Sequence, residues 1–290
     1  MADGLRDLPI AVEMLDAARS SGLDLSAVLA GGDEQLRPTE IAQPALLFVE
    51  CALRSTLPAD LDIVAVAGHS VGEYAAAVSA HALHPADAMR LVIERGRAMA
   101  AMHEGTMCAL IGIDVDAATA VCDETQRATG AVVVVANHNA PGQLVISGST
   151  AGVDAAAKLA LARGARRAIP LNVSGAFHSP LMTSAASQFE TALDGVAIAD
   201  PHPPVVCNVD ARDVHTAVEL RERLRAQLTS PVRWIDCVHR LVALGAEMLI
   251  EVGPGTVLSG LARRIVPEVR AISVSTPDAA ARLDAAAVAG

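Results

Sequence analysis

The sequence predicts an α/β protein with a mostly parallel sheet, flanking helices and one inserted subdomain. Short β-branched runs alternate with longer stretches of helical periodicity over most of the 290 residues, which indicates parallel strands joined by helices. One apolar run, residues 62–67, leads directly into Gly-x-Ser-x-Gly and an alanine-rich helical stretch. The pattern then changes over residues 105–172. We therefore assign residues 1–104 and 173–290 to a large α/β domain and 105–172 to an insert.

The first hundred residues contain helical patterns around a single strand. Apolar positions recur at helical spacing from Leu5 and stop before Gly22, and Pro38 opens a second long helix. Pro58 and Asp60 form a loop that leads into the strand. Helices are predicted at 5–21, 24–32, 37–55, 71–81 and 86–102, and the strand at 62–67.

The insert follows a different order of elements. Its pattern is strand, helix, strand, strand, helix and strand, with a loop at Pro141-Gly142 between the two central strands. This is the split βαβ order of a ferredoxin-like subdomain. Strands are predicted at 106–113, 131–137, 143–147 and 166–172, and helices at 116–129 and 150–163.

Alternation of helix and strand resumes after the insert. The glycine-rich turn Gly253-Pro254-Gly255 separates a strand from a helix, and the chain ends in an alanine-rich tail. Helices are predicted at 180–193, 216–227, 231–244 and 256–265, and strands at 204–208, 247–251 and 270–274.

The turn around Ser70 has the form of a nucleophile elbow in a hydrolase-like α/β fold. Gly68 and Gly72 keep side chains out of the contact between strand and helix. The serine hydroxyl lies at a helix N-terminus, where free backbone N–H groups can stabilise a developing oxyanion. The alternative is a serine that only caps the helix.

A serine nucleophile needs a base. His69 precedes the serine directly and is expected to point away from it across the strand. His178 lies where the insert returns to the main domain and a new helix begins. From the residues alone, a hydrogen-bonded loop histidine is the favoured explanation of His178, and a base for the serine is the alternative.

Composition excludes several other classes. The net charge of −11 disfavours nucleic acid as a partner. No apolar run approaches eighteen residues, and the first residues do not resemble a signal peptide. The five cysteines are scattered without a Cys-x-x-Cys pair, which indicates neither a disulfide nor a metal framework. We expect a cytoplasmic protein that does not associate with membranes.

Several motifs together resemble the malonyl-CoA:acyl-carrier-protein transacylases, to which polyketide synthase acyltransferase domains are related. The resemblance covers residues 5 to 275. It is carried by Gly68-His69-Ser70-Val71-Gly72-Glu73, Gly175-Ala176-Phe177-His178-Ser179, Gln43-Pro44-Ala45, Arg95-Gly96-Arg97, Asn137 to Gln143, Gln227 to Trp234 and Glu251 to Gly255.

The resemblance implies a role for each matching residue. Ser70 is the nucleophile, His178 its base, and the backbone carbonyl of Gln227 orients that histidine. The backbone N–H of Val71 donates to the oxyanion. Arg95 clamps the free carboxylate of a malonyl group, because a guanidinium matches a carboxylate in shape and charge. Without the resemblance, Arg95 reads as part of a surface ion pair with Glu94 and Arg97 nearby.

Three further residues are expected near the substrate. In the relatives, a phenylalanine at the position of Phe177 accompanies malonyl and a serine accompanies methylmalonyl. One methyl group in such a pocket changes binding by about 1–3 kcal/mol, which gives a preference only. Asn137 and Asn139 either hydrogen-bond the thioester arm or stabilise their own loop.

The sequence departs from the family at its start. The relatives begin with a strand and Gly-Gln-Gly-Ser-Gln, whose glutamine N–H supplies half of the oxyanion hole, and neither precedes Gly4 here. Loss of one donor typically lowers the rate about 10²–10³-fold, and loss of the strand leaves an open sheet edge or groove. Three explanations stay open: a start placed too far downstream, an inactive remnant, or another backbone N–H in that role.

The resemblance implies malonyl transfer from malonyl-CoA to the phosphopantetheine thiol of an acyl carrier protein, for fatty acid or polyketide synthesis. The enzyme is expected to be a monomer that needs no metal or cofactor. Two alternatives are a serine hydrolase and a non-catalytic partner of an acyl synthase. An acidic carrier would bind a basic patch, for which the candidates are Lys158, Arg163, Arg166 and Arg167. The alternative is that these side chains only occupy a solvated helix C-terminus, which suits their charge.

Overall fold

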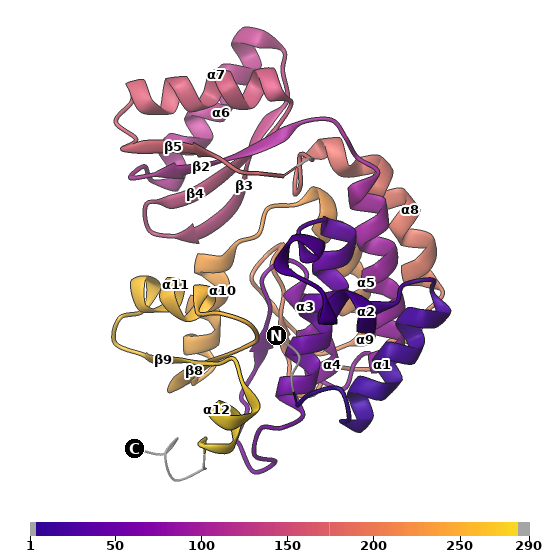
Figure 1. Ribbon diagram of the computed structural model, residues 1–290. Coiled ribbons are helices and arrows are strands. Elements are labelled where there is room, and N and C mark those ends of the chain that lie inside the picture. The colour runs from indigo at the N-terminus through magenta and orange to yellow at the C-terminus, as the bar shows by residue number, and fades with distance from the viewer. Residues whose placement is uncertain (1–3, 174, 284–290) are drawn as a thin grey trace.

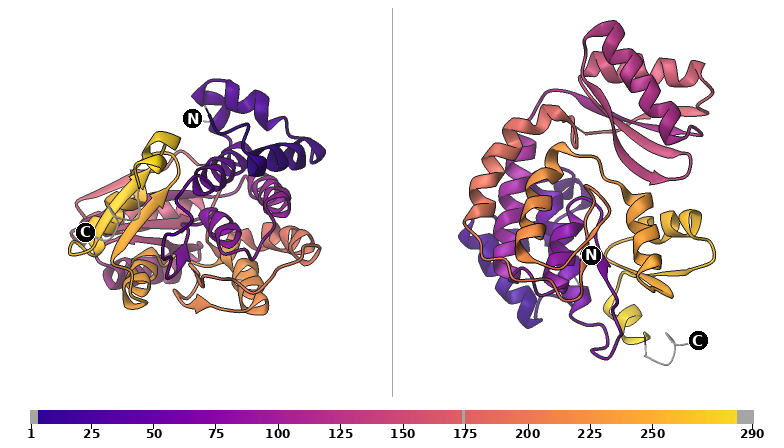
Figure 2. Two further views of the ribbon diagram at one scale, coloured as in Figure 1. Left: turned by 90° about the horizontal axis from the view of Figure 1, so that it is seen from below. Right: turned by 180° about the vertical axis from the view of Figure 1, so that it is seen from behind.

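A computed structural model describes residues 4–173 and 175–283 of the chain. The last seven residues of the predicted alanine-rich tail, 284–290, lie outside the described residues. Figure 1 shows three parts: the insert, a helical body, and a smaller unit made by the C-terminal segment. Figure 2 shows the same arrangement from below and from behind. Among the described residues, none of the helices has the length and apolar character needed to cross a lipid bilayer.

The helical body is formed largely by the first hundred residues. Helix α3 packs against α5, and α1 packs against α5 from another side. Gly96 permits the α3–α5 contact, because a Cβ there would lie 2.9 Å from the Cα of Glu40. The elements are α1 (Pro9–Ser20), α2 (Leu25–Ala30), the 3-10 helix η1 (Asp33–Leu36), α3 (Thr39–Arg54), α4 (Gly72–Ser79) and α5 (Pro85–Ala100).

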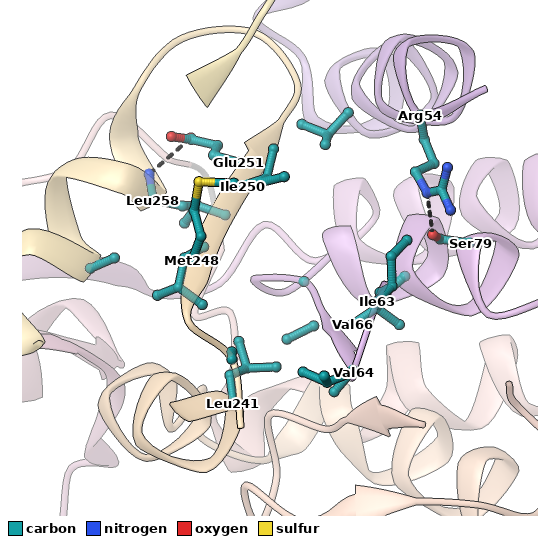
Figure 3. A pocket seen from close by; sticks show the side chains of 18 of the residues that line it. Arg54, Ile63, Val64, Val66, Ser79, Leu241, Met248, Ile250, Glu251 and Leu258 are labelled. Atoms are coloured by element: carbon teal, nitrogen blue, oxygen red, sulfur yellow. Dashed lines mark hydrogen bonds between the residues drawn. The ribbon is translucent and has the colours of Figure 1, made fainter. Parts of the chain in front are cut away.

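Two separate small sheets occupy the interior of the large domain. Strand β1 (Val66–Ala67) runs parallel to β6 (Val205–Val206), which pairs antiparallel with β7 (Asp213–Val214). Strand β8 (Met248–Val252) runs parallel to β9 (Arg270–Val274). The predicted strand 62–67 pairs only at its last two residues. Among the described residues, 62–65 have no strand partner, because β6 begins only at Val205, opposite Val66, and a cavity borders these residues (Figure 3).

The insert forms one antiparallel sheet with the order β3-β4-β2-β5 and helices α6 and α7 packed against it. This is the strand order expected of a ferredoxin-like unit. The domain boundaries at 104/105 and 172/173 stay predictions. The elements are β2 (Thr106–Ile111), α6 (Val115–Thr129), β3 (Val133–Ala140), β4 (Gln143–Gly148), α7 (Thr150–Ala162) and β5 (Arg167–Pro170).

The remaining helices return the chain to the large domain. Helix α8 packs against α5, and α10 contacts β1, β6 and the insert strand β3. The predicted helix 231–244 begins three residues later, at Trp234, because residues 232 and 233 bond the backbone of Ala136 and Asn208 instead. The elements are η2 (Pro180–Met182), α8 (Thr183–Asp194), α9 (Ala217–Ala226), η3 (Gln227–Thr229), α10 (Trp234–Ala243), α11 (Val257–Ile265) and α12 (Pro277–Ala281).

Candidate active site

Ser70 lies in a sharp turn between β1 and α4. Its backbone has φ 54°, a left-handed conformation that is uncommon for residues with a side chain. A Cβ on Gly68 would lie 2.0 Å from the backbone of Gly72, so strand and helix approach this closely only with glycine at 68. Backbone strain of this kind is typical of functional sites. The predicted elbow is therefore present in the structure.

Asn208 holds this turn in place from a distant part of the chain. Its Oδ1 accepts a hydrogen bond from the backbone N–H of Ser70 at 2.7 Å. Its Nδ2 donates to the carbonyl oxygen of Gly68 at 2.8 Å. Asn208 is fully buried, directly after β6. One amide side chain thus bonds the backbone on both sides of the turn.

His178 is brought to the serine hydroxyl. Its Nε2 lies 2.8 Å from Ser70 Oγ, and its Nδ1 lies 3.0 Å from the backbone carbonyl oxygen of Gln227. A carbonyl can only accept, so Nδ1 carries the proton and Nε2 presents its lone pair to the serine. Burial, followed by the positive charge of Arg95, lowers the pKa of His178 to about 3. The imidazole is therefore neutral at physiological pH and can accept a proton.

Arg95 points into the site from α5, with only 1% of its surface exposed. Its Nη2 donates to Ser70 Oγ at 3.1 Å and to Gln227 Oε1 at 2.9 Å, while Nη1 donates to Gln43 Oε1 at 2.5 Å. Its Nε has no hydrogen-bond partner within the described residues. All three acceptors are neutral. The surface ion pair considered from the sequence instead joins Arg97 to Glu94.

Glu73 is a buried carboxylate that is linked to Arg95 through a shared hydrogen-bond partner, Gln227. Gln227 Nε2 donates to Glu73 Oε2 and, at 2.9 Å, to the carbonyl oxygen of Ser70. Burial raises the pKa of Glu73 to about 7, although hydrogen bonds and the charge of Arg95 oppose that shift. Gln227 thus contacts Arg95, Ser70 and Glu73 with its side chain and His178 with its backbone.

The backbone N–H of Val71 is available at the start of α4. Among the described residues it donates to no other group, whereas the N–H groups of Gly72 and Glu73 bond the carbonyl oxygens of His69 and Ser70. A free N–H beside the serine at a helix N-terminus can stabilise negative charge.

The structure places the remaining predicted residues, Asn139, Asn137 and Phe177, in three different contacts. Oδ1 of Asn139 accepts a hydrogen bond from Nε2 of His69 at 2.8 Å, and the His69 ring also packs against Trp234. This contact supports the loop-stabilising alternative for Asn139. Asn137 is buried and pairs through its backbone with Val232. Phe177 packs between the cores of the large domain and the insert, next to His178.

Sequence reasoning missed three residues of this network. Gln43 was noted only as part of a matching motif, and neither Glu73 nor Asn208 was given a role. Each is buried and polar, and each bonds a partner 52 or more residues away in sequence. An isolated polar residue gives no periodic pattern, so the one available signal for Gln43 and Glu73 is their place within a matching motif, and Asn208 lies in none of these motifs.

The sequence also matches known proteins. A profile described as an acyl transferase domain matches residues 11–280. The malonyl CoA-acyl carrier protein transacylase of Bacillus subtilis is 41% identical over 277 residues, which cover 93% of this chain and 87% of that protein. The chain belongs to the malonyl-CoA:acyl-carrier-protein transacylase family.

Solved structures of this transacylase family agree in fold. The transacylase of Coxiella burnetii has a TM-score of 0.89 at 34% identity, covering 97% of this chain and 90% of that one. A malonyl-transacylase solved in complex with its type II polyketide synthase acyl-carrier protein also gives 0.89, at 36% identity, with 97% and 92% covered. The predicted family and the hydrolase-like α/β fold are thus confirmed. The role of each residue in this transacylase site stays a prediction.

Proposed function

We propose that this chain transfers a malonyl group from malonyl-CoA to the phosphopantetheine thiol of an acyl carrier protein through a malonyl ester of Ser70. One observation carries the proposal: a buried guanidinium, hydrogen-bonded only to neutral groups, lies 3.1 Å from a serine hydroxyl that is paired with a neutral histidine. A buried cation without a direct ionic partner favours an anionic ligand. The site thus suits an acyl group with a free carboxylate.

The first half-reaction forms the ester. His178 Nε2 takes the proton of Ser70 Oγ as the oxygen attacks the thioester carbonyl. The N–H of Val71 donates to the oxyanion of the tetrahedral intermediate. When the C–S bond breaks, His178 returns the proton to the sulfur of coenzyme A, which leaves as the thiol.

The second half-reaction reverses these steps with a different thiol. His178 takes the proton of the phosphopantetheine thiol, and the sulfur attacks the ester carbonyl. The bond to Ser70 Oγ then breaks, and His178 returns the proton to that oxygen. Gln227 keeps the imidazole in one tautomer throughout, because its carbonyl accepts only from a protonated Nδ1.

Arg95 has two effects in this scheme. It pairs with the malonyl carboxylate. Gln43 and Gln227 assist this pairing, because their hydrogen bonds hold the guanidinium in place. That pairing also offsets the positive charge that lowers the pKa of His178. Bound malonyl therefore makes the histidine a stronger base when the reaction begins.

The carrier protein is the second partner of the proposed reaction. The predicted basic patch lies at the end of α7 and the start of β5 in the insert, and one member, Arg163, already pairs with Glu124. It remains a candidate docking surface. A monomeric state, a cytoplasmic location and independence from metals and cofactors also remain predictions.

A serine hydrolase would use the same serine and histidine but leaves Arg95 without a task. Radiolabelled malonyl-CoA, supplied with and without carrier protein, separates the two reactions. We expect label on Ser70 and then on the carrier, and loss of both in Arg95→Ala. Release of free malonate that is insensitive to Arg95→Ala would instead identify a hydrolase. Absence of any label on Ser70 would favour the non-catalytic alternative.

A further inference from the structure

A series of hydrogen bonds joins Arg95 to the carboxylate of Glu73 through one intervening side chain. Nη2 of Arg95 donates to Oε1 of Gln227 at 2.9 Å, and Nε2 of Gln227 donates to Oε2 of Glu73. The three side chains come from α5, η3 and α4, and each residue is at most 1% exposed. We call Arg95, Gln227 and Glu73 the buried triad. Its groups follow the order guanidinium, amide and carboxylate.

The amide of Gln227 has a single orientation that satisfies its neighbours. In the observed orientation its oxygen faces the guanidinium, and its nitrogen faces Glu73 and, at 2.9 Å, the carbonyl oxygen of Ser70. A reversed amide would place the nitrogen against Arg95, which has no acceptor, and the oxygen against two acceptors. Three hydrogen bonds would then become three repulsive contacts in a buried site. The neighbours of Gln227 therefore decide which of its atoms Arg95 meets.

Among these neighbours, Glu73 depends most on the observed orientation. The carbonyl oxygen of Ser70 also accepts from the backbone N–H of Glu73 at 3.1 Å, and Nη2 of Arg95 also donates to Ser70 Oγ. Oε1 of Glu73 accepts from the backbone N–H of Asn208. Within the described residues, Oε2 has Gln227 as its one hydrogen-bond donor. Because a buried acceptor without a donor is costly, Glu73 fixes the orientation of the amide.

Glu73 is a double acceptor, and this property distinguishes a carboxyl group from an amide. Each carboxyl oxygen keeps a lone pair whether the group is ionised or protonated, so both hydrogen bonds persist on either side of neutral pH. A glutamine at this position could accept the N–H of Asn208 with its oxygen, but its nitrogen would then face the nitrogen of Gln227. The two nitrogens would have to separate, or the amide of Gln227 would have to reverse.

The orientation of this amide sets the direction of the guanidinium. Nη1 of Arg95 donates to Oε1 of Gln43 and Nη2 donates to Oε1 of Gln227, so a neutral oxygen holds each terminal nitrogen. A bidentate pair with a carboxylate requires the plane of the guanidinium to be fixed. Loss of the acceptor at Nη2 would release one side of that plane. The carboxylate of a bound acyl group would then meet a displaced guanidinium.

We propose that Glu73 is a positioning residue for acyl selection, which holds the Gln227 amide with its oxygen toward Arg95 and so keeps the guanidinium aimed at the carboxylate of the bound acyl group. The selection part of this inference rests on the proposed function, because that function supplies the acyl carboxylate. The positioning part rests on the contacts of the buried triad. The experiments therefore measure the two parts separately.

Binding of two thioesters tests the selection part. In a Ser70→Ala background, which cannot form the ester, isothermal titration calorimetry measures Kd for malonyl-CoA and for acetyl-CoA. Glu73→Gln should raise the Kd of malonyl-CoA about tenfold or more and that of acetyl-CoA less than about twofold, because only malonyl has a distal carboxylate. Glu50→Gln is the matched control and should change neither Kd. It removes a carboxylate whose pKa burial also raises, but it lies on α3, outside the buried triad.

A serine-directed probe separates positioning from a general loss of structure. A fluorophosphonate reacts with an activated serine hydroxyl and carries no acyl carboxylate, so its rate reports on Ser70 and His178 alone. With Ser70 intact, Glu73→Gln should react within about threefold of the rate of the unsubstituted protein. Equal losses of affinity for both thioesters, or a loss of labelling as large as the loss of malonyl affinity, would overturn the proposal. Glu73 would then only support the fold.

An exchange of two side chains tests the positioning part without any substrate. Glu73→Gln should lower the urea midpoint of unfolding by about 0.5 M or more, because two amide nitrogens then face each other. Addition of Gln227→Glu gives the nitrogen at position 73 an acceptor again, so the exchanged pair should regain at least half of that loss. The pair should not regain malonyl affinity, because the carboxylate at position 227 pairs with Arg95 directly and occupies the guanidinium.

The outcomes distinguish failure of this inference from failure of the proposed function. Additive midpoint shifts, or full recovery of malonyl affinity in the exchanged pair, would overturn the positioning role of Glu73. If Ser70→Ala alone binds the two thioesters equally, the proposed function and the selection part fail together, whereas a recovered midpoint in the exchanged pair still supports the positioning of Arg95. If Glu73→Gln does not fold, a folded exchanged pair supports the pairing of amide and carboxylate, and an unfolded pair overturns it.

Discussion

The side chain of Asn208 accepts the backbone N–H of Ser70 at 2.7 Å, 138 residues away in sequence. The same side chain donates to Gly68, so it fixes the left-handed turn that aims the hydroxyl at His178. The position of the Ser70 hydroxyl thus depends on a residue that does not contact the hydroxyl itself.

Asn208→Ala should lower kcat more than it raises KM. The variant leaves a buried N–H and a buried carbonyl without partners, which lowers the free energy of unfolding by about 1–3 kcal/mol. A displacement of the hydroxyl by a fraction of an ångström should lower kcat about 10–100-fold. Steady-state kinetics with malonyl-CoA measure both constants. Asn172→Ala, at an exposed asparagine, is the matched control and should be neutral. An unchanged kcat in Asn208→Ala would refute the positioning role.

Arg95→Gln should change acyl selectivity. A charge-assisted hydrogen bond to a carboxylate contributes about 1.5–3 kcal/mol, so kcat/KM for malonyl-CoA should fall about 10–150-fold. Acetyl-CoA has no distal carboxylate and should lose little. Competition between the two thioesters measures the ratio directly. Equal losses for both substrates would show that Arg95 supports the fold of the site and does not select its ligand.

The pH profile should reflect the lowered pKa of His178. Burial and Arg95 hold this pKa at about 3, so the base stays deprotonated above that value. We expect kcat/KM to remain flat from pH 5 to 8, without an acid limb near the ordinary histidine pKa of about 6.5. Arg95→Gln removes a positive neighbour and should move the acid limb upward.

The pH dependence of the free energy of unfolding should also reflect the lowered pKa of His178. The folded pKa of His178 lies below the unfolded value, so between about pH 3 and 6.5 the unfolded chain binds more protons. This contribution to the free energy of unfolding is therefore lost as the pH falls through that window. The free energies of unfolding of the protein and of His178→Gln, measured with urea, should diverge within this pH window and change in parallel above pH 7.

The residues that the structure brings together at the elbow, Ser70, His178 and Arg95, could be found from sequence because each lies in a short contiguous motif. Gly68, Ser70 and Gly72 follow an apolar run, and the turn they require is local. His178 and Arg95 needed the resemblance, since no local pattern relates them to a serine 108 and 25 residues away.

The pairing of residues 62–65 could not be found from sequence for a different reason. Their β-branched composition correctly favours extended backbone, but a strand also needs a neighbour, and neighbours are set by the tertiary fold. The structure provides β6 beside Val66 and Ala67 and a cavity on the opposite side. The same reason applies to Gln43, Glu73 and Asn208, because their hydrogen bonds form only after distant segments of the chain meet.

Phe177→Ser should relax the choice of acyl group. The ring packs between the core of the large domain and the insert core of Met107, Ala136 and Val145, next to His178 in sequence. A smaller side chain leaves room for a methyl branch, whose effect is about 1–3 kcal/mol. The ratio of kcat/KM for malonyl-CoA over methylmalonyl-CoA should therefore fall at least fivefold. A constant ratio would place the ring outside the acyl pocket.

Glu50→Gln should stabilise the protein at high pH only. Burial and the charge of Glu251 raise the pKa of Glu50 to about 7. The folded chain therefore binds more protons than the unfolded chain between about pH 4.5 and 7, and stability is lost as the pH rises through that window. At about 1.4 kcal/mol per pKa unit, and less because the side chain borders a cavity, Glu50→Gln should raise the free energy of unfolding by about 1–3 kcal/mol at pH 8 and not at all at pH 4.

Urea unfolding at the two pH values measures this difference. Glu34→Gln, whose side chain is 85% exposed, is the matched control and should shift stability at neither pH. An equal gain at pH 4 and pH 8 would mean that Glu50 acts through packing and not through its charge.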